Sequence, residues 1–286
     1  MSPNRWSMWR AAQVVALCQV TFAVGGIARA EEPATTDPQA EKRQLRMATL
    51  FEDTSLRYAQ DPARDLVRSP KAVVKYTNPL NSFQLYASMF LWFDGEVPVA
   101  VSSPSFRDTG NIYWEWTSLT SQPLVLKRQD RVVWQPEKAG HNPQRLPDAD
   151  SPADSAAARL TQMRAIARRF MVTEVRRETT QETRLLTQPL YRWKDPSHDV
   201  IDAAMFAFVE ATDPELLLLI EARLESGKTD RVWFYTLARM TSSPCTVKLD
   251  EQTVWSTEAY WKNPRASQDP YIEAVIGKFD VEEFFR

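Results

Sequence analysis

Apolar and polar positions alternate along much of the chain, which predicts β-strands. Residues 112–117 alternate with period two, so that three apolar side chains share one face, as in a half-buried strand. Apolar runs at 85–93 and 97–101 flank Asp94 and Gly95, and Asp-Gly between two such runs is a strong hairpin signal. Pro98 cannot donate a ladder hydrogen bond, so we expect its strand at a sheet edge or at a bulge.

This pattern returns later in the chain. Residues 120–134 match residues 241–255 at a constant offset of 121 positions, and six residues are identical. Shorter matches precede this stretch and indicate an internal duplication with units near 71–135 and 184–256. The matched segments are 75–79 with 192–196, Met89 and Phe90 with Met205 and Phe206, Glu96 and Val97 with Glu215 and Leu216, and Trp114 and Trp116 with Tyr235 and Leu237.

The duplication decides one ambiguous segment. Asp213, Pro214 and Glu215 precede the apolar run 216–220, which by itself favours a helix with proline in its first turn. The matching segment of the first unit is the second arm of the expected hairpin. Because a duplicated unit should keep one fold, we expect a buried strand at 216–220.

Helical spacing is clearest between the two units. Apolar residues from Leu160 to Phe170 recur every three or four positions, after a possible N-cap at Asp154 or Ser155, and predict a helix over about 154–178. Its other face is basic and includes Arg159. Such a helix can lie on a membrane surface, but docking on a sheet with the charged face in solvent is the more common arrangement. A weaker helical pattern covers 44–60, and another runs from Asp269 and Pro270 to Phe279.

These elements predict an α+β protein that is mostly β. Two repeated antiparallel β units are joined by a long amphipathic helix. Units this short bury little surface alone, so we expect them to share one core; the alternative is two separate small domains on a helical linker. The expected divisions are a signal peptide at 1–30, a leader and weak helix at 31–70, a first repeat at 71–135, a linker at 136–183, a second repeat at 184–256 and a helical cap at 257–286.

The N-terminus has the layout of a secretory signal peptide. Arg5 and Arg10 precede an apolar run over 11–27, and a small-x-small site ends at Ala30. We therefore expect cleavage after Ala30 and a secreted or periplasmic protein, with a membrane anchor as the alternative. Cleavage also removes Arg29 and no acid, so the formal charge changes from −2 to −5 through the loss of three positive charges. That charge argues against a nucleic-acid partner, and no later stretch is long enough to span a membrane.

Only Cys245 remains after cleavage, so the mature chain cannot form an intrachain disulfide. Cys245 takes the place that Leu124 has in the first unit. A cysteine in place of an inward-facing leucine should be buried and unreactive.

The duplicated unit, the helical stretch 156–170 and the stretch 188–196 resemble a family of uncharacterised secreted proteins from planctomycete-type bacteria. The resemblance covers roughly residues 70–260. It implies secretion and duplication. It implies no catalytic residues, because the family has no assigned activity.

Motifs for common chemistries are missing from the sequence. The two histidines, His141 and His198, have no partner at metal-site spacing, so we expect no His/Cys metal site. Seven glycines and no Gly-rich loop leave no basis for a nucleotide cofactor. His198 with Asp199 and Asp202 could orient an imidazole beside a carboxylate, but the local composition is that of a turn. We therefore assign no catalytic residue, metal or cofactor.

Two groups of residues keep function open. Glu210, Asp213, Glu215 and Glu221 could supply the paired carboxylates of a glycoside hydrolase. Of the tryptophans that remain after cleavage, most sit at repeated apolar positions, as in a core, and only Trp261 lies outside the repeat. We expect an exported, non-catalytic binding or structural protein whose partner is a protein or polysaccharide of the cell envelope. The alternative is a carboxylate-dependent hydrolase of an envelope polysaccharide, which requires two carboxylates about 5 to 10 Å apart in a cleft.

Overall fold

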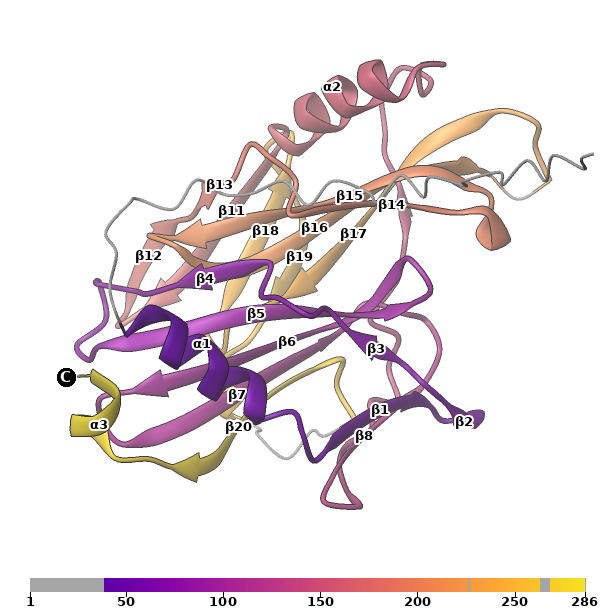
Figure 1. Ribbon diagram of the computed structural model, residues 1–286. Coiled ribbons are helices and arrows are strands. Elements are labelled where there is room, and N and C mark those ends of the chain that lie inside the picture. Colours follow the sequence, from indigo (N-terminus) through magenta and orange to yellow (C-terminus); the bar gives the residue numbers. More distant parts are fainter. Residues whose placement is uncertain (1–38, 226, 263–267, 286) are drawn as a thin grey trace, which may run out of the picture.

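The described residues form four antiparallel sheets, two built mainly from each half of the chain (Figure 1). The computed structural model describes residues 39–225, 227–262 and 268–285. Strands account for 52% of the described residues and helices for 13%, which confirms the mostly β prediction. The predicted signal peptide, its cleavage site and residues 31–38 of the leader lie outside the described residues.

The first half begins with one helix and continues with nine strands. The helix is α1 (Ala40–Thr49). The strands are β1 (Thr54–Tyr58), β2 (Asp61–Asp65), β3 (Val67–Arg68), β4 (Val74–Tyr76), β5 (Leu85–Asp94), β6 (Val97–Arg107), β7 (Asn111–Ser118), β8 (Leu124–Arg128) and β9 (Arg131–Trp134).

The second half follows a short strand, β10 (Gln144–Arg145), and has the same order of elements. Its helix is α2 (Ala156–Ala167). Its strands are β11 (Phe170–Arg176), β12 (Thr179–Glu182), β13 (Arg184–Leu185), β14 (Tyr191–Asp195), β15 (Val200–Glu210), β16 (Asp213–Leu224), β17 (Arg231–Arg239), β18 (Cys245–Leu249) and β19 (Gln252–Thr257). The 3₁₀ turns η1 (Pro196–His198) and η2 (Tyr260–Lys262), strand β20 (Tyr271–Lys278) and helix α3 (Val281–Phe285) complete the chain.

The sheets of the two halves have corresponding strand orders. The small sheets run β2-β1-β8-β9 and β12-β11-β18-β19, and the large ones run β20-β7-β6-β5-β3 and β10-β17-β16-β15-β13. Strands β4 and β14 add to β5 and β15. Strand β10, which follows β9, pairs with β17 of the second half, whereas β20, which follows β19, pairs with β7 of the first. Each half therefore contributes one strand to the large sheet of the other.

The two long hairpins confirm the strand predictions and share a detail. Gly95 has a φ of +61° in the β5–β6 turn, a left-handed value that glycine adopts without strain. The register shifts between Trp92 and Phe93, where Pro98 pairs with Phe93. In the β15–β16 hairpin the shift lies between Phe208 and Val209, and Pro214 pairs with Val209. Both prolines therefore sit at a bulge, and 216–220 is a buried strand.

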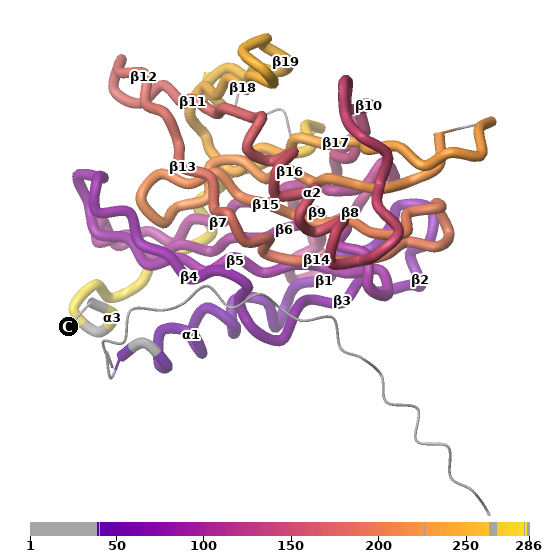
Figure 2. The backbone as a smooth tube through the Cα atoms, turned by 90° about the horizontal axis from the view of Figure 1, so that it is seen from above, coloured from indigo at the N-terminus to yellow at the C-terminus, as the bar shows by residue number. Residues whose placement is uncertain are grey.

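A hydrophobic core lies between the halves, where the two large sheets face each other (Figures 1 and 2). It joins Tyr76 and Met89 of the first half to Trp193 and Met205 of the second. This cluster supports the shared-core prediction over two separate domains. Each half also has its own cluster of buried apolar residues, which lies between its large and its small sheet.

Helix α2 is shorter than the predicted 154–178. It starts after Ser155, whose side chain accepts a hydrogen bond from the Ala158 amide, and it ends at Ala167. From Phe170 the apolar period changes to two, and β11 pairs with β18, so tertiary pairing ends the helix. Residues 170–182 are thus strands and not linker. Arg159 belongs to the face that we expect in solvent. It is instead buried, and its Nε–H donates to Asp202 at 2.8 Å.

The predicted helices at the two ends also need correction. The first helix covers 40–49 only, and β1 occupies 54–58 of the expected 44–60. At the C-terminus, residues 271–278 form strand β20 and not a helix, because they pair with β7 and bury Tyr271 and Glu273 on alternate positions. Among the described residues of 257–286, the helical elements are the 3₁₀ turn η2 and helix α3.

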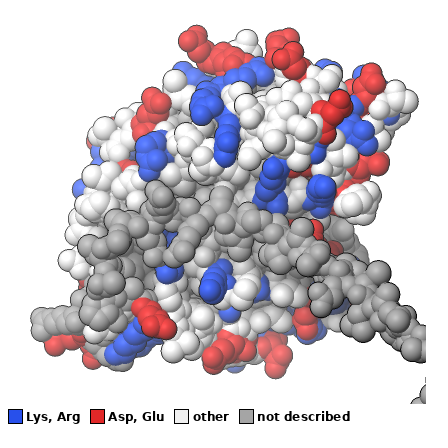
Figure 3. Space-filling model, turned by 45° about the horizontal axis from the view of Figure 1, so that its top comes forward, with Lys and Arg blue, Asp and Glu red and all other residues white. Residues whose placement is uncertain are grey.

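Tryptophans and surface charges follow the sequence expectation in most places. Trp92, Trp114, Trp116, Trp134, Trp193 and Trp233 are buried, whereas Trp261 is 48% exposed. Lys and Arg are interspersed with Asp and Glu on the face shown in Figure 3. Within the described residues, no helix combines the length and the apolar character needed to cross a membrane.

Candidate functional site

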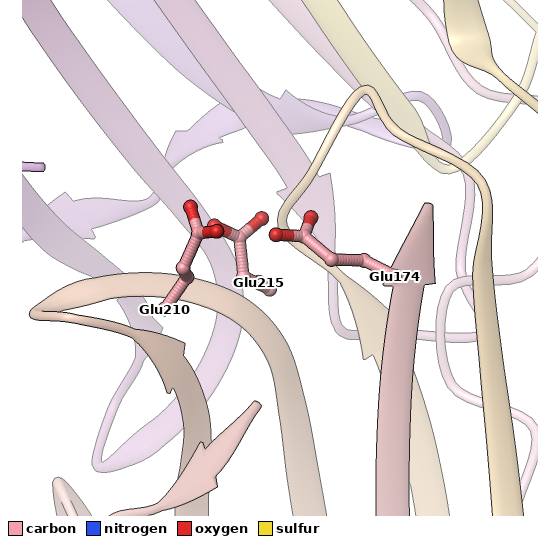
Figure 4. A group of neighbouring side chains, drawn as sticks. All are labelled: Glu174, Glu210 and Glu215. Atoms are coloured by element: carbon pink, nitrogen blue, oxygen red, sulfur yellow. The ribbon is translucent and has the colours of Figure 1, made fainter. Parts of the chain in front are cut away.

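Three buried carboxylates converge at one end of the second half (Figure 4). Glu174, Glu210 and Glu215 each place a carboxylate oxygen within 4.8 Å of the others. They come from three different strands, β11, β15 and β16. Burying three acids together opposes their ionisation, so the cluster needs a compensating charge or protons.

Strand geometry explains why these side chains meet. On β11, Phe170, Val172 and Glu174 point inward on alternate positions. Glu210 ends β15, and Glu215 is the extra residue of the β16 bulge, because Val209 pairs with Pro214 while Phe208 pairs with Leu216. A bulge bends a strand and re-aims the side chain that it carries.

The guanidinium of Arg176 lies among the three carboxylates. Its Nε is 3.2 Å from Glu174, its Nη1 is 2.7 Å from Glu210 and its Nη2 is 2.9 Å from Glu215. Burial lowers the pKa of Arg176, but the attraction of Glu215, Glu174 and Glu210 outweighs it and raises the pKa overall. Arg176 is therefore the fixed positive charge of this cluster.

A second acidic pair comes from the first half and the strand added to it. Glu115 of β7 and Glu273 of β20 are direct cross-strand neighbours, an arrangement that is unfavourable when both are charged. Tyr271 donates its hydroxyl to Glu115 at 2.6 Å. Arg107 Nη2 and Trp261 Nε1 donate to Glu273 at 2.6 and 2.9 Å.

A pocket of about 240 Å³ lies between the two acidic groups and is lined by both halves of the chain. We call it the acidic pocket. Four carboxyl groups and three arginines line it, together with one tyrosine, Tyr76. These residues are Glu115, Asp213, Glu215, Glu273, Arg107, Arg176 and Arg177.

Burial dominates the protonation of these acids. It raises the pKa of Asp213 to about 7, although Asn78 and Arg176 lower it. It raises the pKa of Glu115 well above the usual range, with a further increase from Glu273. The pKa of Glu215 is raised in the same way by burial and then by Asp213, and that of Glu174 by burial and Glu210, despite Arg176. Burial and mutual repulsion thus favour the protonated forms of these acids, whereas Arg176 opposes this at Glu174 and Glu215.

Hydrogen bonds connect this site across the halves. Asn78 Nδ2 donates to Glu210 at 2.8 Å and more weakly to Asp213 at 3.4 Å. Arg176 Nη1 donates to Asn81 at 2.8 Å. Even so, one oxygen each of Glu174 and Glu210 is buried and accepts no hydrogen bond from the described residues.

The three converging glutamates have the oxygen ligands that hard cations prefer. In this arrangement, however, Arg176 occupies the space toward which they point. A divalent ion would have to displace that guanidinium. The donor set therefore favours a site for an additional cation beside Arg176, in the acidic pocket, over a metal within the glutamate cluster.

The structure brings together part of the predicted carboxylate set. Glu210, Asp213 and Glu215 meet in one site, whereas Glu221 lies elsewhere and contacts His141 at 3.1 Å and Arg223 at 3.4 Å. The proposed match of Glu96 with Glu215 is wrong. Pro98 and Pro214 hold the same place in their hairpins, so Glu215 corresponds to Val99.

The histidine hypothesis does not match the geometry. His198 Nδ1 lies 2.7 Å from Asp195, and its side chain is 67% exposed in a 3₁₀ turn. Asp202 instead forms ion pairs with Arg159 and Arg192. His198, Asp199 and Asp202 therefore do not form one site.

Sequence reasoning missed Glu115, Glu174, Glu273, Arg107 and Arg176. Glu174 was hidden by the overlong helix, because only the strand pattern of 170–176 shows that it occupies an inward position. Glu273 was hidden in the same way by the expected C-terminal helix. An acid between two tryptophans, as at Glu115, was a signal that could have been used.

Cys245 is buried as predicted. Burial, followed by the repulsion of Glu215 and Glu174, raises the pKa of its thiol to about 12.

Comparison with protein-family models, with curated proteins and with solved structures finds no match to this chain.

Proposed function

We propose that the protein is an exported, non-catalytic binding protein that takes a small organic cation in the acidic pocket between its halves. The observation that carries this proposal is the excess of buried carboxyl groups at the pocket. Glu174 and Glu210 each have a carboxylate oxygen within 4.8 Å of one of Glu215, which lines the pocket. Among the described residues, only Arg107 and Arg176 form ion pairs with this set of six acids.

A bound ammonium group would replace protons. With its pKa at about 7, Asp213 is half protonated near neutrality, and burial raises the pKa of Glu115 and of Glu215 as well. A cation placed beside them would favour their charged forms. Binding would therefore release protons, and the affinity would increase with pH through the titration of Asp213. The Glu210 oxygen that accepts no hydrogen bond from the described residues is an additional acceptor.

We also propose that the two halves arose by internal duplication. The corresponding strand orders, the bulges at Pro98 and Pro214 and the reciprocal placement of β10 and β20 support it. Export, with cleavage after Ala30 and an envelope or extracellular location, rests on the N-terminal pattern alone. The resemblance to secreted proteins of planctomycete-type bacteria agrees with both.

A hydrolase acting on an envelope polysaccharide is the second candidate. Asp213 favours it, because a pKa of about 7 suits general acid–base catalysis near neutrality. The hydrogen bonds of the other acids oppose it. Glu115 accepts from Tyr271, Glu273 accepts from Arg107 and Trp261, and Glu215 accepts from Arg176. A second carboxylate free to act as nucleophile or base is thus missing from the lining residues.

Calorimetry with putrescine as the probe tests the binding proposal. We expect saturable binding that releases protons and strengthens from pH 5 to pH 8. Asp213→Asn and Glu215→Gln keep the shape and remove the charge, and each should weaken binding roughly tenfold or more, since a charge-assisted hydrogen bond contributes about 1.5–3 kcal/mol. Glu96→Gln, on the exposed turn of the corresponding hairpin, is the matched control and should bind like the wild type.

Equal putrescine affinity in the wild type and Asp213→Asn would contradict the proposal. Tight binding of Ca²⁺ with no binding of putrescine would redirect the site to a metal. Hydrolysis of an envelope polysaccharide that is lost in Asp213→Asn and retained in Glu96→Gln would instead establish the second candidate.

A further inference from the structure

A second and larger pocket, of about 440 Å³, lies between the two halves. Its walls come from β7, β17 and β19 and from the segments around Gly140 and Pro270. Its lining includes none of the carboxyl groups of the acidic pocket. We call it the aromatic pocket, because Tyr235, Trp255, Tyr260 and Tyr271 line it.

Arg239, the last residue of β17, supplies the main charge of the aromatic pocket. Its Nε donates to the Thr241 carbonyl, its Nη1 donates to Thr257 Oγ1 at 2.9 Å and its Nη2 donates to the Ser243 carbonyl at 3.2 Å. These three bonds hold the guanidinium in place and leave two of its five N–H donors for a ligand.

The partners of Arg239 are all neutral. No carboxylate among the described residues forms an ion pair with it, whereas Arg107 and Arg176 each have one or more. Burial lowers the pKa of Arg239, although Tyr271 and more distant acids raise it. A partly buried cation without a directly paired anion is unfavourable unless an anion is supplied.

The aromatic walls are arranged around this charge. The Arg239 guanidinium lies 4.9 Å from the centre of the Tyr271 ring, and Tyr260 packs edge-on against Tyr271 with ring centres 5.3 Å apart. Gln144 of β10 adds an exposed amide at the rim. The other charged side chains of the lining, Lys138 and Asp269, pair with each other.

We propose that the aromatic pocket binds a sugar acid. The sugar ring would pack on the half-buried Trp255, while the buried tyrosines form the wall behind it. The carboxylate would accept from the two remaining donors of Arg239, and the hydroxyls would bond to amides such as Gln144. A pocket of this volume is within the usual range for small-molecule sites. An arginine fork fits a carboxylate geometrically. This site is independent of the cation proposed for the acidic pocket.

The test compares D-glucuronate, D-glucose and benzoate by calorimetry and by ligand-detected NMR. We expect glucuronate to bind at least tenfold more tightly than glucose, which lacks the carboxylate, and than benzoate, which lacks the hydroxyls. Arg239→Gln should lower glucuronate affinity tenfold or more. Because Arg239 also supports the 241–243 turn, Gln144→Glu is the second variant: it places a repelling carboxylate at an exposed position and should weaken binding without disturbing the fold.

Glu96→Gln serves as the distant control and should bind glucuronate like the wild type. Three results would overturn the proposal: glucose binding as tightly as glucuronate, benzoate binding as tightly as glucuronate, or an unchanged glucuronate affinity in the folded Gln144→Glu variant. Putrescine binding should be unaffected by Gln144→Glu, which separates this site from the acidic pocket.

Discussion

The two halves place different residues at one corresponding corner of the fold. Strands β1 and β11 hold the same place in their sheets. In the first half Tyr58 pairs with Leu124, and in the second Glu174 pairs with Cys245. Burial, followed by Asp94, raises the pKa of Tyr58 to about 12, so the first corner holds a neutral phenol where the second holds a buried carboxyl group.

The ends of the two long hairpins also differ in their acidic residues, with more of them in the second half. Asp94 ends β5 and forms an ion pair with the exposed Arg64, whereas Glu210 ends β15 and contacts the half-buried Arg176. Val99 follows Pro98 where Glu215 follows Pro214. One carboxylate in the first corner thus corresponds to three in the second.

This difference shows what the architecture itself requires. The same bulged hairpin and the same strand pairing form around a phenol, a valine and one exposed ion pair. The acids of the second corner are therefore not needed to make the fold. Burying them is unfavourable, which is why we assign them to ligand binding.

The largest expected effect concerns the exchanged strands. A chain that ends at Gln268 lacks β20 and α3, which removes the pairing partner of β7 and exposes its buried tryptophans. We expect this variant to show no cooperative thermal unfolding by circular dichroism. Gln144→Pro disrupts only the two-residue β10 in the other half and should retain a cooperative transition. Cooperative unfolding of both proteins would refute the importance of β20.

The next effect tests the central arginine. Arg176→Met leaves three buried carboxylates without their counter-charge, and should lower the free energy of unfolding at pH 7 by about 3–5 kcal/mol. Arg64→Met breaks the exposed pair of the first corner and should lower it by less than about 1 kcal/mol. Urea unfolding measures both. Similar losses for the two variants would mean that the corners are energetically equivalent.

The two corners should also differ in how their contribution to stability depends on pH, and this difference should be smaller than the effect of Arg176→Met. Asp213 has a folded-state pKa raised from 3.8 to about 7. Folding therefore favours its protonated form, and this stabilisation is complete below pH 4 and is lost as the pH rises toward and through 7. Asp213→Asn mimics the protonated group and should flatten this part of the stability curve in urea unfolding at pH 4 to 8. The matched Asp94→Asn variant should keep the wild-type slope; an unchanged slope in Asp213→Asn would show that this carboxyl group is not responsible.

The smallest expected difference is at Cys245. Its thiol is buried and its pKa is raised to about 12, so very little thiolate exists at pH 8. A thiol reagent should label the native protein only as fast as it unfolds. In a Cys245→Ser background, Leu124→Cys places a cysteine at the corresponding buried position of the first half. This cysteine should react with the reagent as slowly as Cys245 does in the wild type. Rapid labelling of either cysteine would indicate local opening of its sheet.

Local signals were sufficient for the hairpins and for the buried cysteine. Asp-Gly at 94–95 and the proline at 98 carry their conformation in their own covalent structure, so their consequences were predicted. Helix ends were not, because residues 170–176 and 271–278 become strands only through pairing with β18 and β7. The sequence predicted the site only in part. Glu210, Asp213 and Glu215 are close together in the sequence, whereas Glu115, Glu174 and Glu273 come from distant strands that only tertiary pairing brings together.

By itself, the sequence determined that the chain is rich in strands and that the β5–β6 hairpin turns at Asp94 and Gly95, because backbone preference and apolar period are local properties. Only the tertiary structure decided which acids meet, which of them Arg176 neutralises, and that β10 and β20 exchange places. Ionisation of a buried carboxyl group depends on all charges and solvent around it, and these are set by contacts between residues far apart in the chain.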